Sequence, residues 1–348
     1  MDWRLNLLKE KELSVIISNR NDINMLCVTV RSCLEEFKPL GQDNCDVIVV
    51  DNSDPEYYER AKATIPTGYL RDEMVVIERQ EEPCLFSARE LAAKISKSKY
   101  IICLDSHMLV GRDMFLDLFN FMEDHRDDPT IGFAHAPITW AHQHECRARH
   151  DRDISQHELG PWGVAYSEPR TITWKGMPWI CRRDWFLDRD GGLGGYGALA
   201  DHRVSWGGGD MHIGVKPWLL GYKNWAVPTS PGIHIGPFPR TDNHKGNLND
   251  TVVTKDINEV NQYRVYSDSG QFPHTFGFLV SCYVLGGEPM MHRNKEMITE
   301  RFGKYIKVED WWDVAIKVGA EEREWLLSRQ KMSFEQFLQD QPWNNGVH

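Results

Sequence analysis

The stretch that decides the fold is KYIICLDSHMLV, residues 99–110. Its apolar run from Tyr100 ends abruptly at Asp105-Ser106-His107, as expected of a buried parallel strand that delivers ligands at its carboxyl end. Side chains alternate along an extended chain, so Asp105 and His107 point the same way and can bind one divalent cation together. The alternative is that Asp105 caps a following helix and His107 is an ordinary loop residue. Ligands of open α/β sheets bind outside the carboxyl ends of the strands, which favours a metal site.

The composition is that of an ordinary globular chain. With 348 residues, 41% of them hydrophobic and 26% charged, it predicts one large or two smaller domains. The net charge of −11 argues against a broad nucleic-acid-binding surface but leaves room for a local basic channel. The eight cysteines have no CxxC or zinc-finger spacing. Those in apolar runs, such as Cys103 and Cys181, are expected to be buried free thiols, which favours a reducing compartment.

No apolar leader follows Met1, and no apolar run is long enough to span a membrane. We therefore expect a soluble, cytoplasmic protein without a membrane anchor, of the kind that a bacterium or a phage encodes.

The first third of the sequence alternates strand and helix patterns. Short apolar runs that end in polar residues predict strands, and longer amphipathic segments between them predict helices. The expected strands are 13–18, 46–50, 74–77 and 99–104, and the expected helices are 23–37 and 85–95. The apolar side of the first helix is expected to carry Met25, Val28, Val30 and Leu34. This alternation is typical of a parallel sheet with right-handed crossovers, so we predict a nucleotide-binding α/β domain.

Polar side chains at the strand ends suit a nucleoside, because carboxylates accept hydrogen bonds from a base N–H or from ribose hydroxyls. Neither GxGxxG nor the Walker pattern occurs, which argues against dinucleotides and P-loop chemistry. A diphosphate bound without such a loop needs a cation and a positive side chain. Asp105 and His107 with a metal, together with Arg89, can supply both. The alternative for Arg89 is a solvated position on its helix.

Three segments, in this order, resemble a known family. They are LSVIIS (13–18), DVIVVDNS (46–53) and LFSARELAAKISKSKYIICLDSH (85–107). Together they look like the nucleotide-sugar half of the GT-A glycosyltransferases, with the family 2 enzymes as the wider match. The Leu-Asp-Ser-His string is similar to the Asp-x-His metal motif of the polypeptide N-acetylgalactosaminyltransferases. The resemblance implies a GT-A (Rossmann-like) α/β fold, in which helices flank a mostly parallel sheet, and a UDP-sugar donor.

The same resemblance implies roles for individual residues. Asp51 would contact the uracil, Arg89 would lie on the diphosphate side, and Asp105 and His107 would hold Mn²⁺ or Mg²⁺. The expected nucleotide-sugar site as a whole comprises Ser18, Asn19, Arg20, Asp51, Arg89, Asp105, Ser106, Trp206, Gly207 and Gly208.

The second half of the chain extends the resemblance through GMPWICRRDWFLDRDGGLGGYG (176–197) and WGGGDMHIGVKPWLLGY (206–222). Glycines let the backbone approach a sugar closely, and a carboxylate at a helix N-terminus is stabilised by the helix dipole. The resemblance gives Asp210 the position of a general base, with Arg89 as the second catalytic residue. The simpler alternative is a glycine turn with a capping Asp210. Gly209 and His212 stand where related enzymes have acidic residues, so an inverting and a retaining outcome both stay open.

A third metal ligand is implied by GIHIGPFPR (232–240), which resembles the loop where the N-acetylgalactosaminyltransferases carry a His after Gly. In this chain Pro237 follows Gly236, and the nearest imidazole is His234. We expect His234 to be the ligand. The match to the family's ligand position stays open. That position corresponds to Pro237, whereas side chains alternate along a strand, so His234 shares a face with position 236 and not with 237.

The resemblance covers roughly residues 12–240. We therefore expect a GT-A catalytic domain at 1–240, with its nucleotide-sugar half at about 1–110 and its acceptor half at about 111–240. Residues 142–157, rich in histidine, are expected to form a polar loop near the site.

Residues 241–348 lie outside the resemblance and are expected to form a lid loop and a helical C-terminal region. The lid over the donor is expected at 242–256. Amphipathic helices from residue 304 onward (VEDWWDVAIKVG, EEREWLLSRQ, FEQFLQDQ) are expected to pack on the catalytic domain. Their Trp311, Trp312 and Trp325 are expected in the core, with acceptor binding as the alternative.

These observations predict a metal-dependent glycosyltransferase that moves a sugar from a UDP-sugar to an acceptor hydroxyl of a protein or glycan, with Mn²⁺ or Mg²⁺ as cofactor. Asp210 would deprotonate or orient the acceptor. One alternative acceptor is the hydroxymethyl group of a modified DNA base, as in phage-type enzymes. An alternative of another class is an inactive nucleotide-sugar-binding protein. The presence of Asp105, His107 and Asp210 argues against it.

Overall fold

The structure of the protein is a computed structural model. The residues that it describes are 11–65, 74–140, 170–172, 177–204, 207–235, 252–254, 264–266, 271–302 and 307–340.

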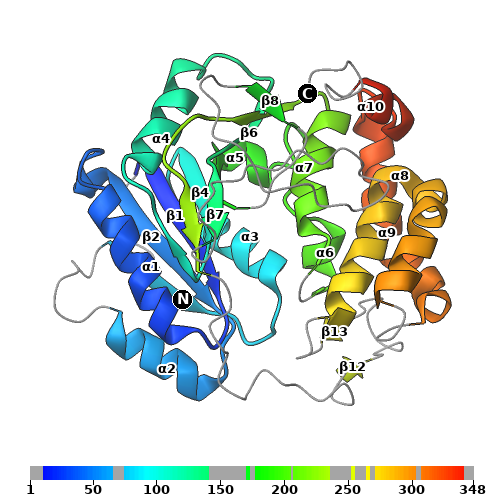
Figure 1. Ribbon diagram of the computed structural model, residues 1–348, viewed down its shortest axis with the longest axis horizontal. Helices are drawn as coiled ribbons and strands as arrows, with labels where there is room; N and C mark the ends of the chain where they lie inside the picture. The colour runs from blue at the N-terminus through cyan, green and yellow to red at the C-terminus, as the bar shows by residue number, and fades with distance from the viewer. Residues whose placement is uncertain are drawn as a thin grey trace.

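A mostly parallel sheet forms the centre of the described chain (Figure 1). It has eight strands in the order β3-β2-β1-β4-β9-β6-β10-β8. The first four of these are parallel neighbours, β9 runs antiparallel between β4 and β6, β10 is parallel to β6, and β8 is antiparallel to β10. The strands are β1 (Leu13–Asn19), β2 (Cys45–Asp51), β3 (Val75–Arg79), β4 (Tyr100–Asp105), β6 (Ile131–His135), β8 (Arg170–Ile172), β9 (Trp179–Arg182) and β10 (Lys223–Ala226).

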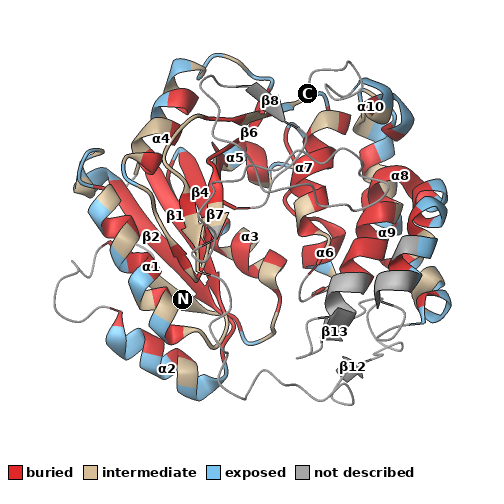
Figure 2. Cartoon of the chain, viewed as in Figure 1, coloured by how far each residue is buried: buried red, intermediate tan, exposed pale blue. Residues whose placement is uncertain are grey.

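Helices cover both faces of this sheet (Figure 1). On one face α1 packs on α2 and α4, and on the other α3 packs on α5 and α6. Because both faces are covered, β1 and β2 are buried along their whole length, as the red strands of Figure 2 show. The helices are α1 (Ile23–Glu36), α2 (Pro55–Thr64), α3 (Leu85–Ile95), α4 (Met114–Asp124), α5 (Arg183–Leu187) and α6 (Ala198–Asp201), and a short 3₁₀ turn, η2 (Gln42–Asn44), precedes β2.

A small three-stranded sheet lies at the carboxyl end of β4. Its strands, in the order β5-β11-β7, are β5 (Met108–Leu109), β11 (Gly232–His234) and β7 (Ile138–Trp140). β5 and β11 are antiparallel, and their register pairs His234 with Met108. The backbone N–H of Ile235 also donates to the carbonyl of His107. This pairing brings His234 beside the Asp105-Ser106-His107 turn.

The C-terminal helices form a layer on the other side of α7 from the sheet (Figure 1). α8 and α9 pack along each other, both contact α6, and α8 and α10 contact α7. α8 kinks at Gly287, where the backbone leaves helical geometry. The bounds are α7 (Gly209–Leu219), α8 (Gln271–Phe302), α9 (Val308–Arg329) and α10 (Phe334–Asp340), and a two-stranded ribbon joins β12 (Val252–Thr254) and β13 (Arg264–Tyr266).

The predicted fold class is confirmed: helices flank a mostly parallel sheet, and a helical region follows at the C-terminus. Two details of the sequence analysis were wrong. Val28 is 42% exposed, because the buried side of α1 is centred on Leu26, Val30 and Cys33. The segments VEDWWDVAIKVG and EEREWLLSRQ are not separate helices, since α9 continues through Gly319 at the end of the first segment and ends at Arg329 near the end of the second.

The described cysteines are free thiols, as predicted. None of the helices in the described ranges is long and apolar enough to cross a membrane. The expected polar loop at 142–157 and all of the expected lid except β12 fall outside the described residues.

Candidate active site

Three side chains converge outside the carboxyl ends of the parallel strands. Asp105 ends β4, His107 follows it, and His234 ends β11. The Nε2 atoms of the two histidines lie 3.1 Å apart, and Asp105 Oδ2 lies 3.7 Å from His234 Nε2. One ligand atom from each residue lies within 4.8 Å of the others. Two imidazoles and a carboxylate suit a divalent transition metal such as Mn²⁺, so the residues present fit the metal that the sequence predicts.

The electrostatics of Asp105 also suit a cation ligand. Burial would by itself raise the pKa of this carboxyl, but the hydrogen bond from His234 and the positive charge of Arg89 hold it well below its usual range. The side chain is therefore a carboxylate at neutral pH. A carboxyl group binds a metal ion in this deprotonated form.

Arg89 lies beneath Asp105 and not in the open. Its side chain is 4% exposed, and Nη2 donates to Asp105 Oδ1 at 2.8 Å. Nη1 donates to the hydroxyl of Tyr196 at 3.2 Å. The guanidinium of Arg89 therefore contacts the site by its hydrogen bond to the Asp105 carboxylate. A direct contact between Arg89 and the diphosphate stays a prediction, and the solvated alternative for Arg89 is wrong.

The register of the sheet places the expected nucleotide residues side by side at the carboxyl ends of β1, β2 and β4. Ser18 pairs with Asp105 on β4, and Asn19 pairs with Asp51 on β2. Asp51 is fully buried: Oδ2 accepts from Asn19 Nδ2 at 2.6 Å, and Oδ1 accepts from the backbone N–H of Ser53 at 2.7 Å. In this geometry Asp51 fixes the two strand ends. Its contact with uracil stays a prediction.

Arg20 and Ser106 complete this edge. Arg20 Nη1 donates to the carbonyl of Asn52 at 2.8 Å, which ties the end of β1 to the loop after β2. The Ser106 side chain is buried, and its carbonyl accepts from the hydroxyl of Thr29 at 2.9 Å. Both residues therefore lie at the strand ends where the sequence analysis expected nucleotide contacts, and these contacts stay predictions.

The expected acceptor side begins at the turn before α7. Gly208 caps the helix with φ +77°, and a Cβ there would lie 2.2 Å from the carbonyl oxygen of Gly277 on α8. Only glycine fits, because the turn is left-handed and α8 lies directly on it. Gly207, also at positive φ, precedes it, whereas Trp206 lies outside the described residues.

Asp210 lies in the first turn of α7 and is half-buried. The preceding residue, Gly209, lies against Phe86 of α3, and the ring of Phe86 packs on Tyr196, the hydrogen-bond partner of Arg89. A side chain would not fit at Gly209, because a Cβ there would lie 2.2 Å from the ring of Phe86 on α3. The structure thus brings Asp210 to the same side of the molecule as the three convergent ligands.

Sequence reasoning missed a set of buried polar residues behind this site. Lys216 of α7 pairs with Glu322 of α9, with side chains 0% and 2% exposed. His212 Nδ1 lies 3.0 Å from the hydroxyl of Ser281. The available signal was weak: Lys216 stands in an otherwise apolar stretch of helix, and its partner lies 106 residues away in sequence.

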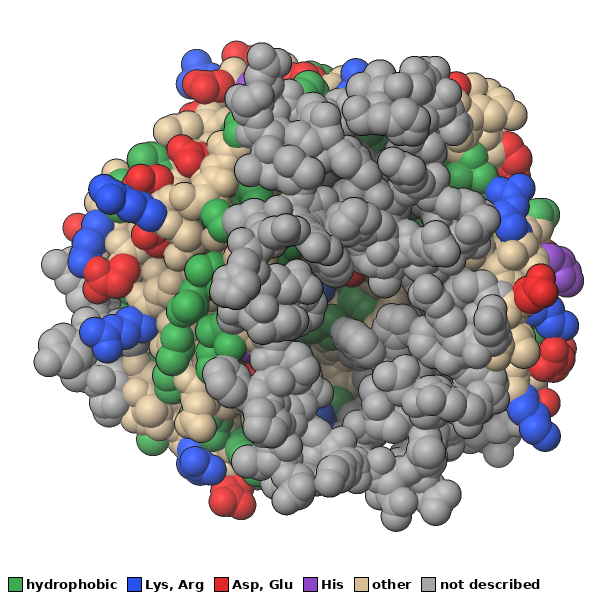
Figure 3. Space-filling view, in the orientation of Figure 1, with side chains coloured by type: hydrophobic (Ala, Val, Ile, Leu, Met, Phe, Trp, Pro, Cys, Tyr) green, Lys and Arg blue, Asp and Glu red, His purple; other side chains and the backbone are tan. Residues whose placement is uncertain are grey.

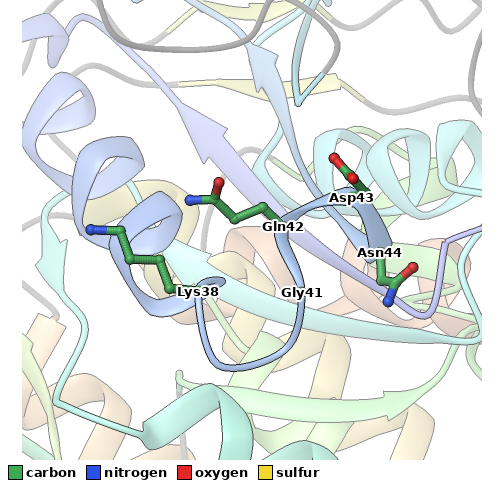
Figure 4. Close-up of a pocket in the computed structure, with 5 residues that line it drawn as sticks. All are labelled: Lys38, Gly41, Gln42, Asp43 and Asn44. Carbon is green, nitrogen blue, oxygen red and sulfur yellow. The ribbon is translucent and has the colours of Figure 1, made fainter.

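A surface hollow elsewhere on the protein is not part of the site. It lies at the turn that leads into β2 (Figure 4) and is lined by Lys38, Gly41, Gln42, Asp43 and Asn44. That turn is at the amino end of β2, whereas Asp51 and Asp105 lie at the carboxyl ends of parallel strands. The hollow and the candidate site therefore lie at opposite ends of the parallel strands.

Comparison with known proteins shows what the N-terminal part of the chain is similar to in sequence. Residues 14–145 match the model of the family described as glycosyl transferase family 2. No curated protein matches the chain. The matched segment includes the ends of β1, β2 and β4 but not that of β11.

Solved structures extend the likeness to the rest of the chain. A crystal structure of GalNAc-T7 with UDP, GalNAc and Mn²⁺ is 18% identical, with a TM-score of 0.64 over 97% of this chain and 58% of that one. A structure of TarS residues 1–349 from S. aureus with UDP-GlcNAc is 12% identical, with a TM-score of 0.50 over 90% of this chain and 83% of that one. The chain thus spans little more than half of the GalNAc-T7 structure. At these identities the likeness establishes the fold.

The fold is therefore of the GT-A type, and residues 14–145 are similar in sequence to glycosyl transferase family 2. The chain is similar to the family 2 enzymes and, in fold, to an N-acetylgalactosaminyltransferase, as the sequence analysis expected.

Proposed function

We propose that this protein is a metal-dependent glycosyltransferase that transfers a sugar from a UDP-sugar to an acceptor hydroxyl. The observation that carries the proposal is the convergence of Asp105, His107 and His234 at the carboxyl edge of a GT-A sheet. This edge is where open α/β sheets bind nucleotides. The family match over residues 14–145 supports the reaction class.

On the donor side, Asp105, His107 and His234 would hold Mn²⁺ or Mg²⁺. A bound cation supplies charge that stabilises a leaving diphosphate. Asn19 and Arg20, fixed by Asp51 and by the carbonyl of Asn52, would bind the nucleoside at the ends of β1 and β2. Arg89 contributes a buried positive charge and holds one oxygen of Asp105 in place. We infer a UDP-N-acetylhexosamine as the first donor to test, because the GalNAc-T7 structure carries UDP and GalNAc and the TarS structure carries UDP-GlcNAc.

On the acceptor side, Asp210 would take the proton of the attacking hydroxyl or orient that hydroxyl. The helix dipole favours a negative charge at a helix N-terminus, and this role requires a carboxylate. We propose a protein or glycan hydroxyl as the acceptor. On the face in Figure 3, the described Lys and Arg side chains are interspersed with Asp and Glu around the rim, a distribution that supports a protein or glycan over DNA.

The test is UDP release from UDP-GalNAc and UDP-GlcNAc, with Mn²⁺ and separately with Mg²⁺, in the wild type and two variants. Asp105→Ala removes a proposed ligand, and Asp43→Ala removes a carboxylate from the hollow at the other edge of the sheet. We expect metal-dependent UDP release that Asp105→Ala abolishes and Asp43→Ala retains.

Three other outcomes would change the proposal. UDP binding without release, with every common UDP-sugar and both metals, would favour the inactive binding protein. Release stimulated only by DNA that carries hydroxymethylated bases would favour the phage-type acceptor. Release that survives Asp105→Ala would contradict the assigned metal site.

A further inference from the structure

Tyr196 lies behind the metal-ligand cluster and is fully buried. It follows a double glycine in the loop between α5 and α6. Its ring packs on Phe86 of α3 and on Phe186 of α5, with centroid distances of 4.9 and 5.9 Å. The phenolic oxygen accepts a hydrogen bond from Arg89 Nη1 at 3.2 Å. A buried tyrosine usually finds a partner for its hydroxyl, and here the partner is the cation that also holds Asp105.

Buried charged side chains fix the loop that carries Tyr196. The backbone N–H of Tyr196 donates to Glu90 Oε1 at 2.6 Å, and that of Ala198 donates to Glu322 Oε2 at 3.0 Å. Lys216 Nζ donates to the carbonyl of Gly195 at 3.1 Å. Charge-assisted hydrogen bonds in a buried setting are strong and directional. Tyr196 is therefore held at a fixed position relative to α3, α7 and α9.

Arg89 divides its two terminal nitrogens between two acceptors. Nη2 donates to Asp105 Oδ1 at 2.8 Å, while Nη1 donates to the Tyr196 hydroxyl. Asp105 therefore receives one arm of the guanidinium only. Its other oxygen, Oδ2, faces His234 at 3.7 Å and belongs to the side where the three ligands converge.

An arginine beside a carboxylate commonly forms a two-pronged pair, in which both carboxylate oxygens accept. Such a pair would engage Asp105 Oδ2 and compete with a metal for it. We propose that Tyr196 is a positioning residue that occupies Nη1 of Arg89 and so leaves Oδ2 of Asp105 available to the cation. This inference rests on the proposed metal site, and it assigns a function to a residue outside the ligand set.

The test is the affinity for Mn²⁺ alone, measured from the EPR signal of free Mn²⁺ and by calorimetry. Tyr196→Phe removes only the hydroxyl and keeps the ring packing. The matched control is Tyr100→Phe, because Tyr100 is equally buried but its hydroxyl bonds to Glu123 at 2.8 Å near the amino end of β4. We expect Tyr196→Phe to weaken Mn²⁺ binding about 10-fold, the scale of lost contacts to metal ligands, and Tyr100→Phe to leave it unchanged.

A double-mutant cycle tests whether Tyr196 acts through Arg89. In an Arg89→Met background the competing guanidinium is gone, so Tyr196→Phe should have no further effect on Mn²⁺ affinity. Equal losses in both backgrounds, or equal losses in Tyr196→Phe and Tyr100→Phe, would overturn the inference. So would a Tyr196→Phe protein that binds Mn²⁺ as the wild type does. A wild type that binds no Mn²⁺ would instead overturn the proposed metal site itself.

Discussion

His107 is held between two partners: its Nδ1 atom lies 3.4 Å from Asp22 Oδ2, while its Nε2 atom lies 3.1 Å from His234 Nε2. A carboxylate at Nδ1 favours the tautomer that is protonated there, which leaves Nε2 with a free lone pair. Two imidazole nitrogens this close need a proton or a cation between them. The Asp22 contact thus supports Nε2 as the metal-binding atom of His107.

Asp22→Ala is predicted to weaken Mn²⁺ binding about 10-fold, because loss of the outer carboxylate frees the ring and the tautomer of His107. The matched control is Asp54→Ala. Both residues stand at helix N-caps without a side-chain capping bond, but Asp54 precedes α2 and contacts Asn21 only at the surface. Calorimetric Mn²⁺ titration of the two variants checks the prediction. Equal affinities would mean that Asp22 does not act through His107.

His234→Ala is predicted to lower Mn²⁺ affinity by about 10-fold or more, since it removes one of the three proposed ligands. His125→Ala is the control, because His125 lies at the C-terminal end of α4 and bonds to the carbonyl of Phe121. The measurement is Mn²⁺ affinity alongside the thermal midpoint. A His234→Ala protein with a lower midpoint and unchanged Mn²⁺ affinity would return His234 to a purely structural role.

The parts of this site that could be predicted are those that local sequence determines. An apolar strand that ends in Asp-x-His places Asp105 and His107 together at the carboxyl end of that strand, and this placement does not depend on the rest of the chain. His234 was less certain, because its position depends on the pairing of β11 with β5, 124 residues apart in register. Asp22 and Tyr196 were missed for the same reason: each acts through a contact with a distant segment that no local pattern encodes.

The same distinction holds for the fold. The first four parallel strands follow apolar runs with polar ends, and each was predicted within two residues. The pairing of the antiparallel β9 with β4 was not predicted, since it joins segments far apart in sequence, with Cys103 opposite Trp179. The buried Lys216–Glu322 pair joins α7 to α9. This pair could not be predicted, because the sequence does not indicate which distant residue will neutralise a buried charge.

Glu322→Gln is predicted to destabilise the protein by about 3–5 kcal/mol, because it leaves the ammonium of Lys216 buried without a counter-charge. Lys216→Met combined with Glu322→Gln should cost less, since the buried cation is also removed and a glutamine oxygen can still accept from Ala198. Urea unfolding measures both. The control is Glu309→Gln, which breaks an exposed pair with Lys295 and should change stability little. A double variant less stable than the single one would contradict this account.

Asp210→Asn is predicted to leave UDP-sugar binding intact and to lower transfer by roughly 10²–10⁴-fold, the usual scale of general-base catalysis. Asparagine keeps the shape of aspartate but cannot take a proton. The control is Asp184→Asn, a change in the first turn of α5, where the carboxylate is exposed and pairs with Arg183. UDP affinity and initial rates, measured together, separate binding from chemistry. Transfer at the wild-type rate would leave Asp210 as a first-turn residue of α7 that only interacts with the helix dipole.

His212 is predicted to make the protein sensitive to acid. It is 1% exposed, and Nδ1 donates to the hydroxyl of Ser281, which in turn donates to the carbonyl of Gly208. Nε2 has no partner among the described residues. Burial and the nearby charge of Lys216 lower the pKa of His212 from 6.5 to about 3. The folded protein therefore keeps this imidazole neutral, whereas the unfolded chain takes up a proton near pH 6.5.

Because the unfolded state binds the extra proton, the contribution of His212 to stability is fully present above pH 6.5 and is lost as the pH falls toward 3. Between pH 7 and pH 5 this amounts to about 2 kcal/mol. His212→Asn places an amide N–H near the position of Nδ1 and does not titrate, so its unfolding free energy should fall less over the same interval. His125→Asn serves as the control and should keep the wild-type pH dependence. Urea unfolding at pH 5, 6 and 7 measures all three proteins, and parallel pH profiles for His212→Asn and the wild type would contradict the prediction.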